Sequence, residues 1–366
     1  SENRPDGSRM LSVTLAVRYE GKDESLLFNT LNLNKLDITL NLSNPKAVAL
    51  AKDVAKLCDI VVENFRPGVM KALDLDYETI KKVKPDVIYL SSSSRGSTGP
   101  ERSYAGYAPM FAALGGISSI TGRADSLPSS MTGSTDLIVG TSGFFAVMAA
   151  LMYRSKTGKG QYIDLSSSEA VSVLTGDALM EYAINQRNMQ RKGNSDFTMA
   201  PHGCYPCSGE RKWISIAVGS DLEWKAFCDA IGNPDLINDE RFSDESSRRA
   251  NEEDLNILIS EWTRKHTHYE AMEILQNAGV AAMPSLNVKE LFSNPHLMER
   301  SAYAEVDHPV SGIQTVLDSP WKLSATPSII IRHAPLFGEH SEYVFGQLLG
   351  LSDEKIEELK QEKVIY

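Results

Sequence analysis

Residues 131–170 constrain the chain most, because they combine an apolar helix, a glycine turn and a strand in a fixed order. The stretch reads MTGSTDLIVGTSGFFAVMAALMYRSKTGKGQYIDLSSSEA. A turn of small residues leads to a single acid, Asp136, and an apolar run suited to a helix covers residues 137–153. Two glycines then precede the alternating strand 161–165. The pattern predicts a largely buried helix with Asp136 at its start.

Asp136 has two interpretations at this position. An aspartate ahead of an apolar helix is usually the N-cap of that helix. Alternatively, the free N–H groups and the positive end of the helix dipole stabilise a carboxylate that faces a cleft and acts as a nucleophile. The pattern alone does not choose between the two.

The elements before this stretch predict a parallel α/β sheet. Strands are expected around 11–19 and at 35–42, 58–62 and 86–90, and helices at 46–57, 76–83 and 105–119. Ligands of such sheets bind at the carboxyl ends of the strands, so the loops 63–68 and 91–100 are candidate binding loops. The last of these helices ends near Gly115, where another backbone can approach closely.

The order of elements predicts a large and a small domain. Residues 1–186 are expected to form a large, Rossmann-like parallel-sheet domain, which a polar linker then ends. Residues 187–310 are expected to form a small α+β domain, with a strand at 213–218 and a helix with a capping box at Thr267 and Glu270. Residues 311–366 are expected to return to the large domain.

The composition of the chain limits the classes of partner it can bind and the cellular compartment expected for it. A net charge of −11 over 366 residues argues against nucleic acid as a partner but leaves a small anionic ligand open. No apolar run approaches the about 20 residues of a membrane span, and the N-terminus is too polar for a signal peptide, so a cytoplasmic protein that binds no membrane is expected. Cys204 and Cys207 are a redox or zinc pair or, as we favour, ordinary thiols, and no metal site is predicted.

Three motifs, taken together and in this order, carry a resemblance to one known family. They are DIVVENFRPGVM at 59–70, the stretch from Asp136 through RSKTGKGQ at 154–161 to DLSSSE at 164–169, and PLFGEH at 335–340 followed by LLGLS at 348–352. The chain resembles the class III CoA-transferases, the group of formyl-CoA transferase, carnitine CoA-transferase and bile-acid-inducible protein F. The likeness spans nearly the whole chain.

The resemblance implies a fold in which a large nucleotide-fold domain and a small domain close into a ring. Two such rings interlock as a dimer, and the active site lies between the large and the small domain. Members of the family begin with a strand, a glycine-rich turn and a helix ahead of a segment like residues 1–6. Relative to them this sequence begins inside the expected fold, so either the native chain is longer or the protein does without that unit.

The resemblance also implies a mechanism in which Asp136 is the nucleophile. The carboxylate attacks an acyl-CoA thioester, and the resulting mixed anhydride is converted into an aspartyl-CoA thioester. The incoming acid then reverses these steps, so coenzyme A is a co-substrate and no metal is needed. Matched positions suggest that six residues bind coenzyme A: Leu40, Asn64, Phe65, Val69, Lys71 and Tyr107. Lys71 lies near a basic position of the family without matching it, and Tyr107 either lines the CoA channel or is a packed tyrosine with a hydrogen-bonded hydroxyl.

Departures from the family pattern bear on the reaction. Formyl-CoA transferases have a glutamate after the position of Tyr107, and the related racemases have a His-Asp pair there, whereas this chain has Ala108. The difference argues against oxalate as acceptor and against racemisation, which needs two acid/base groups. We expect succinyl-CoA as donor and a bulky or aromatic acid such as benzylsuccinate as acceptor. A racemase-like enzyme and a non-catalytic subunit remain alternatives, as do a homodimer and a heterodimer with a paralogous subunit.

Overall fold

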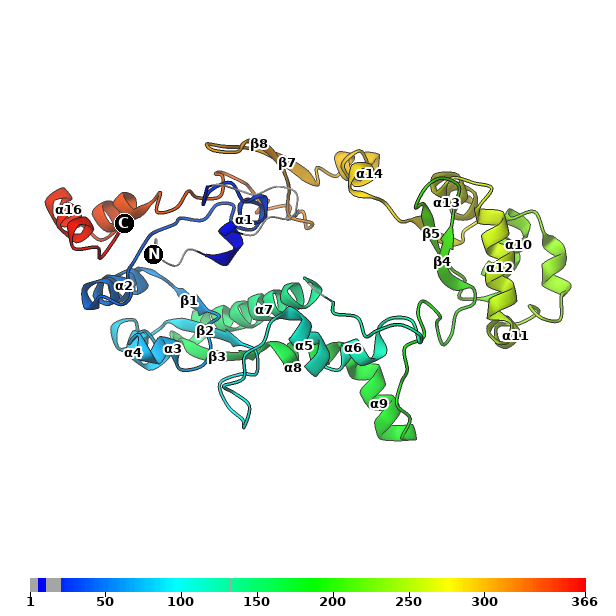
Figure 1. The fold of residues 1–366 in the computed structure, drawn as a ribbon, viewed down its shortest axis with the longest axis horizontal. Coiled ribbons are helices and arrows are strands. Elements are labelled where there is room, and N and C mark those ends of the chain that lie inside the picture. Colours follow the sequence, from blue (N-terminus) through cyan, green and yellow to red (C-terminus); the bar gives the residue numbers. More distant parts are fainter. Residues whose placement is uncertain (1–5, 11–20, 132) are drawn as a thin grey trace. The chain divides into compact units, whose positions relative to one another are not determined.

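The computed structural model describes residues 6–10, 21–131 and 133–366. These residues form two compact units, whose elements are labelled in Figure 1. Unit 1 comprises the described residues of 1–115, 132–173 and 294–366, and unit 2 comprises 116–131 and 174–293. The strand predicted around residues 11–19 lies outside the described residues. The domain boundaries predicted after residues 186 and 310 stay predictions.

A three-stranded parallel sheet in the order β1-β2-β3 is the centre of unit 1 (Figure 1). Its strands are β1 (Ile60–Glu63), β2 (Ile88–Ser93) and β3 (Gln161–Ser166). Ile88 lies opposite Ile60 on one side and opposite Gln161 on the other. The predicted parallel α/β architecture is therefore confirmed, with strand ends that lie at most three residues from the expected ones.

Three helices precede or connect β1 and β2: α2 (Pro45–Leu57), α3 (Val69–Ala72) and α4 (Tyr77–Val83). The Asn44 side chain caps α2 by accepting a hydrogen bond from the Lys46 N–H group at 2.9 Å. Apolar residues of α2, α4 and the strands make one core, whose buried members are Ala55, Leu75, Ile80, Val87 and Tyr89. Each fully buried side chain of this size adds about 1.5–3 kcal/mol to stability.

Helix α7 (Ser134–Thr157) packs one face on β2 and β3 (Figure 1). A Cβ atom on Gly143 would lie 3.2 Å from a methyl group of Leu90 and of Leu165, so glycine permits this close contact. The opposite face is exposed, and only 22% of the most apolar stretch is buried. The prediction of a largely buried helix is therefore wrong for the single chain.

Helix α7 also corrects the expectation that no apolar run is long enough for a membrane. By length and composition it is the one helix among the described residues that could cross a bilayer. Helices in the interior of proteins have the same length and composition, so this property alone does not indicate a membrane.

Two short helices of unit 1, α5 (Ala108–Leu114) and α8 (Ser167–Ser172), pack against α7 and against each other. The helix predicted over 105–119 is split, because Gly116 has a φ of 85° and begins the separate α6 (Ile117–Ile120). The predicted close approach at Gly115 is confirmed. A Cβ atom there would lie 2.9 Å from Val171 Cγ1 and 3.0 Å from the carbonyl oxygen of Ser168.

The remaining elements of unit 1 come from both ends of the chain. They are the 3₁₀-helix η1 (Gly7–Met10), α1 (Leu26–Leu31), α15 (Pro295–Glu299), the hairpin of β7 (Tyr303–His308) and β8 (Gly312–Leu317), the π-helix η4 (Tyr343–Leu348) and α16 (Asp353–Gln361). The strand predicted at 35–42 is wrong. Thr39 Oγ1 donates to the carbonyl oxygen of Tyr366 at 2.7 Å, and the Asn41 N–H group donates to that of Val364 at 2.9 Å. The C-terminal residues thus accept the hydrogen bonds of this segment, which a neighbouring strand would otherwise have accepted.

Unit 2 contains an antiparallel sheet with helices packed on it. Its strands are β4 (His202–Pro206), β5 (Trp213–Ala217) and β6 (Ala281–Pro284), in that order. Its other elements, besides α6, are α9 (Gly176–Asn185), α10 (Asp221–Ala230), η3 (Pro234–Asn238), α11 (Glu245–Ala250), α12 (Glu252–Thr263), α13 (His268–Asn277) and α14 (Val288–Phe292); the 3₁₀-helix η2 (Val173–Thr175) precedes α9. The capping box predicted at Thr267 and Glu270 begins α13 and is confirmed.

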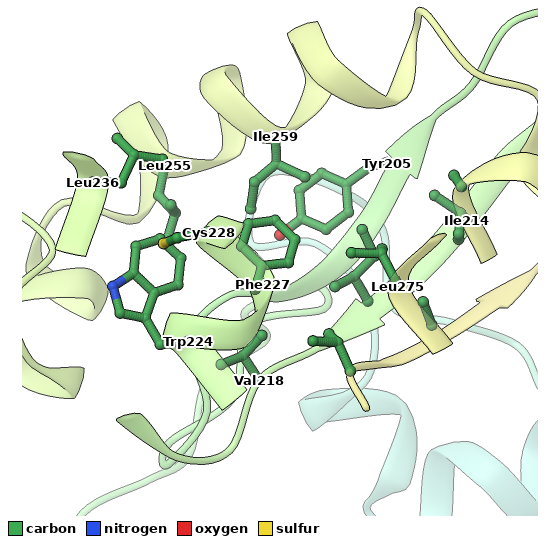
Figure 2. Packing of buried hydrophobic residues seen from close by; sticks show 14 of the residues in the cluster. Tyr205, Ile214, Val218, Trp224, Phe227, Cys228, Leu236, Leu255, Ile259 and Leu275 are labelled. Atoms are coloured by element: carbon green, nitrogen blue, oxygen red, sulfur yellow. The ribbon is translucent and has the colours of Figure 1, made fainter. Parts of the chain in front are cut away.

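The core of unit 2 lies between this sheet and helices α10, α12 and α13. Figure 2 shows Tyr205, Phe227 and Ile259 converging there, with Ile214 and Leu275 beside them. All four cysteines of the chain are free thiols, and burial raises the pKa of Cys207 to about 11. A thiol that stays protonated at neutral pH is a poor nucleophile, which supports the interpretation as ordinary thiols.

Candidate active site

Asp136 lies in the first turn of α7 with an exposed side chain. The N-cap of the helix is Gly133, whose φ is 86°, and Asp136 is the third helical residue. The N-cap interpretation of Asp136 is therefore wrong. No residue that the structure describes donates a hydrogen bond to its carboxylate, which stands near the free N–H groups of the first turn. An exposed carboxylate without a partner is available to react.

A buried hydrogen bond joins the starts of α5 and α7. Thr135 is fully buried, and its Oγ1 donates to the carbonyl oxygen of Ala108 at 3.0 Å. Because Tyr107 precedes Ala108 and Asp136 follows Thr135, the bond brings these two predicted site residues to one place. Tyr107 is 74% exposed, so it is not the packed tyrosine that was the alternative.

This place lies beyond the carboxyl ends of the strands. Gly143 of α7 is level with Leu165, the second-last residue of β3. Asp136 precedes Gly143 by about two helical turns, or ~10 Å along the axis, in the direction in which the strands end. Ligands of parallel α/β sheets bind at that edge. The position of Asp136 fits a site there.

A cleft of 460 Å³ opens at the same edge. It is lined by the loop after β2, the end of α5 and the start of α8, including Arg95, Glu101, Asp164, Ser166 and Ser168. The Asp164 carboxylate holds the loop by accepting hydrogen bonds from the Ser97 N–H group at 2.9 and 3.0 Å. Of the two predicted binding loops, 91–100 lines this cleft.

The other predicted CoA-binding residues lie in two places. Asn64 and Phe65 directly follow β1, and Val69 and Lys71 lie on α3, which begins four residues further on. All four are exposed, and Phe65 exposes 49% of its surface. Leu40 is half-buried against the C-terminal core of Val344, Phe345 and Ile365. Among the described residues, no hydrogen bond joins these residues to Tyr107 or Asp136.

The sequence patterns did not indicate a role for Thr135. A signal was present, because Thr135 shares its spacing with the buried residues Val139, Gly143, Val147 and Ala150 of α7. A hydroxyl on the core-facing side of an apolar helix needs a partner, and that partner had to come from another element. Because Ala108 lies 27 residues before Thr135 in the chain, the sequence pattern could not identify it as the partner.

Comparison with known proteins decides the family. The model for the family described as CoA-transferase family III matches residues 1–341. The chain belongs to CoA-transferase family III. It is therefore an enzyme that transfers coenzyme A, its co-substrate, and acts on acyl-CoA and carboxylic acid substrates.

Two curated relatives and one solved structure show how close the likeness is. The succinyl-CoA–D-citramalate CoA-transferase of Chloroflexus aurantiacus is 32% identical over 95% of this chain and 86% of its own. The succinyl-CoA–L-malate CoA-transferase beta subunit of the same organism is 29% identical over 94% and 86%. A crystal structure of a CaiB/BaiF family protein from Brucella suis, 28% identical, superposes with a TM-score of 0.83 over 94% of this chain and 89% of that one.

Proposed function

We propose that this CoA-transferase moves coenzyme A from succinyl-CoA to a free dicarboxylic acid through a covalent intermediate on Asp136. The observation that carries the proposal is the exposed, unpartnered Asp136 carboxylate in the first turn of α7, beside Tyr107 at the carboxyl edge of the sheet. Both named relatives use succinyl-CoA, which supports the donor.

The proposed reaction conserves the thioester in four steps. An Asp136 carboxylate oxygen attacks the thioester carbon of succinyl-CoA, and the C–S bond breaks to release the CoA thiolate. The thiolate attacks the aspartyl carbonyl of the mixed anhydride, which expels succinate and leaves aspartyl-CoA. The acceptor carboxylate attacks that thioester and again expels the thiolate, which finally attacks the acceptor carbonyl and restores Asp136. The helix N-terminus stabilises the negative charge of the carboxylate.

The names of the relatives and the expectation from the sequence both support a dicarboxylic acid as acceptor. D-citramalate and L-malate, which the relatives' names give, are dicarboxylic acids. Benzylsuccinate, the bulky acid expected from the sequence, is a dicarboxylic acid as well. We propose a dicarboxylate acceptor, with the aromatic substituent as the feature to test in a panel of these acids.

Coenzyme A is proposed to bind at the loop after β1. Phe65 presents an exposed ring on which adenine can stack, and Asn64 offers an amide for polar contact. Val69 adds an apolar contact on α3, and the Lys71 ammonium can face the phosphates. Leu40 and Tyr107 are proposed as further contacts along the pantetheine chain.

A second copy of a CoA-transferase chain is proposed to cover the exposed face of α7. This face carries five exposed apolar side chains, those of Leu137, Phe144, Phe145, Met148 and Met152. Soluble monomers rarely expose so many large apolar side chains in one patch. Asp136 lies at its start, so the partner would border the site. A homodimer of interlocked rings is proposed, and the name of the beta-subunit relative supports testing a heterodimer as well. We place the protein in the cytoplasm, where its free thiols stay reduced.

The covalent intermediate tests the proposal directly. Protein incubated with succinyl-CoA and quenched with hydroxylamine should carry one modification that peptide mass spectrometry maps to Asp136. Asp136→Asn should lack it and lose at least about 10³-fold in kcat. Asp177→Asn, a change of the same kind at an exposed aspartate in the first turn of α9, is the control for charge. An unmodified wild-type protein across a donor panel, alone and with a paralogous subunit, contradicts the proposal.

A further inference from the structure

We propose that Thr135 is a positioning residue, whose buried hydroxyl fixes the turn that carries Asp136. The inference rests on the proposed role of Asp136 as nucleophile. It concerns what holds the backbone beside that carboxylate in place.

Among the residues that the structure describes, no side chain caps the start of α7. Its N-cap, Gly133, has no side chain to accept a hydrogen bond from the free N–H groups. The first backbone hydrogen bond of the helix, from Leu137 N–H to the carbonyl oxygen of Gly133, is long at 3.5 Å. A helix end of this kind frays readily, and Asp136 lies in its first turn.

Thr135 supplies the missing attachment from another element. Its side chain is fully buried, and its bond to the Ala108 carbonyl oxygen spans 3.0 Å. The accepting end of α5 is firm, since the N–H groups of Met110 and Phe111 both bond to the Tyr107 carbonyl oxygen at 2.8 and 3.1 Å. The other end of α5 is packed on α8 at Gly115. A rigid neighbour therefore holds the first turn of α7.

The position of the Asp136 carboxylate depends on this attachment. No described residue bonds to that carboxylate, so the backbone of the first turn sets the position of its Cβ atom and the rotamers open to it. Attack on a thioester carbon needs the oxygen within a narrow range of distance and direction, and a displacement of about 1 Å can lower the rate ~100-fold. Loss of the Thr135 hydroxyl should thus slow the covalent step without removing the substrate contacts.

The test compares Thr135→Val with Thr135→Ser. The single-turnover rate of Asp136 modification by succinyl-CoA is measured together with the Kd of CoA and the circular dichroism spectrum. We expect Thr135→Val to react roughly 10- to 100-fold more slowly with an unchanged Kd, and Thr135→Ser, which keeps the donor, to react within about threefold of wild type. Thr157→Val is the matched control. It removes an exposed hydroxyl at the other end of the same helix, bonded to the Tyr153 carbonyl oxygen at 2.8 Å.

Three outcomes separate this inference from the proposed function. If wild-type protein forms no adduct on Asp136, both fail together. If wild type reacts and Thr135→Val reacts as fast as Thr157→Val, the positioning role is overturned while the covalent mechanism stands. If Thr135→Val does not fold, Thr135→Ser still decides, because a rate at least about 10-fold below that of wild type contradicts a role for the hydroxyl and a near wild-type rate supports it.

Discussion

At the scale of single residues, a substitution of Phe65 tests CoA binding separately from the chemical step. Phe65 is exposed in the loop after β1, and no hydrogen bond among the described residues joins it to the start of α7. If adenine stacks on its ring, Phe65→Ala should raise KM for succinyl-CoA ~10-fold, which corresponds to a stacking loss of about 1.4 kcal/mol, and leave kcat nearly unchanged. Steady-state kinetics measure both. Phe292→Ala, which removes another exposed phenylalanine, in unit 2, should leave KM unchanged. A fall in kcat alone would contradict the stacking role.

The ionised carboxylate of Glu290 stabilises unit 2 in a pH-dependent way. A hydrogen bond from Lys212, then one from the Asn287 N–H group, holds the pKa of the Glu290 carboxyl at about 2 instead of the ordinary 4.5. A group whose folded-state pKa is depressed stabilises the fold above its unfolded pKa and loses that effect as the pH falls through the folded value. Glu290→Gln should therefore lower Tm by about 2–4 °C at pH 7.

The difference between wild type and Glu290→Gln should shrink between pH 4.5 and 2, as thermal unfolding followed by circular dichroism will show. Glu299→Gln is the control, because Glu299 is an exposed glutamate for which no ion pair is recorded within the described part of the chain. A difference that stays constant down to pH 2 would mean that Glu290 acts through packing and not through its charge.

At the scale of elements, the turn from α7 into β3 requires glycine at position 160. A Cβ atom there would lie 2.0 Å from the carbonyl oxygen of Val87 and 2.4 Å from that of Asp86, and backbone atoms cannot move aside as a side chain can. Gly160→Ala should cost at least about 3 kcal/mol of folding free energy or prevent folding. Denaturant unfolding measures the change. Gly176→Ala, where no atom lies within 4 Å of the added methyl, should be nearly neutral.

Elements with local signals were predictable from the sequence, and those fixed by distant partners were not. Thr267 marked a helix start because a cap bonds within its own turn. The strand predicted at 35–42 was wrong because its partners, at Val364 and Tyr366, lie at the other end of the chain. The role of Asp136 as nucleophile comes from the family resemblance and stays a proposal, whereas its N-cap interpretation failed and Thr135 was missed. Both errors arose because the start of α7 is fixed by α5 and not by its own cap.

At the scale of the whole molecule, we propose that α7 links dimer assembly to activity. Its apolar sequence suggests a buried helix, yet in the single chain the face of Phe144, Phe145 and Met148 is exposed. Burial of such a face against a second copy would stabilise the dimer by about 25 cal/mol for each Å² of apolar surface removed from water. The residues of this face follow Asp136 on the same helix, so the partner that covers them would also exclude water from the reacting carboxylate.

Phe145→Asp tests this link, because a carboxylate in an apolar interface is costly to bury. We expect the variant to be monomeric by size-exclusion chromatography with light scattering, where wild type is dimeric. Its kcat should fall together with the dimer fraction, and high protein concentration should restore part of it. Leu222→Asp, at a comparably exposed leucine of α10, should stay dimeric and active. A Phe145→Asp protein that is dimeric and fully active would show that this face is not the interface. A fully active monomer would show that the site needs no partner, and Asp136 would then be shielded from water by its own chain.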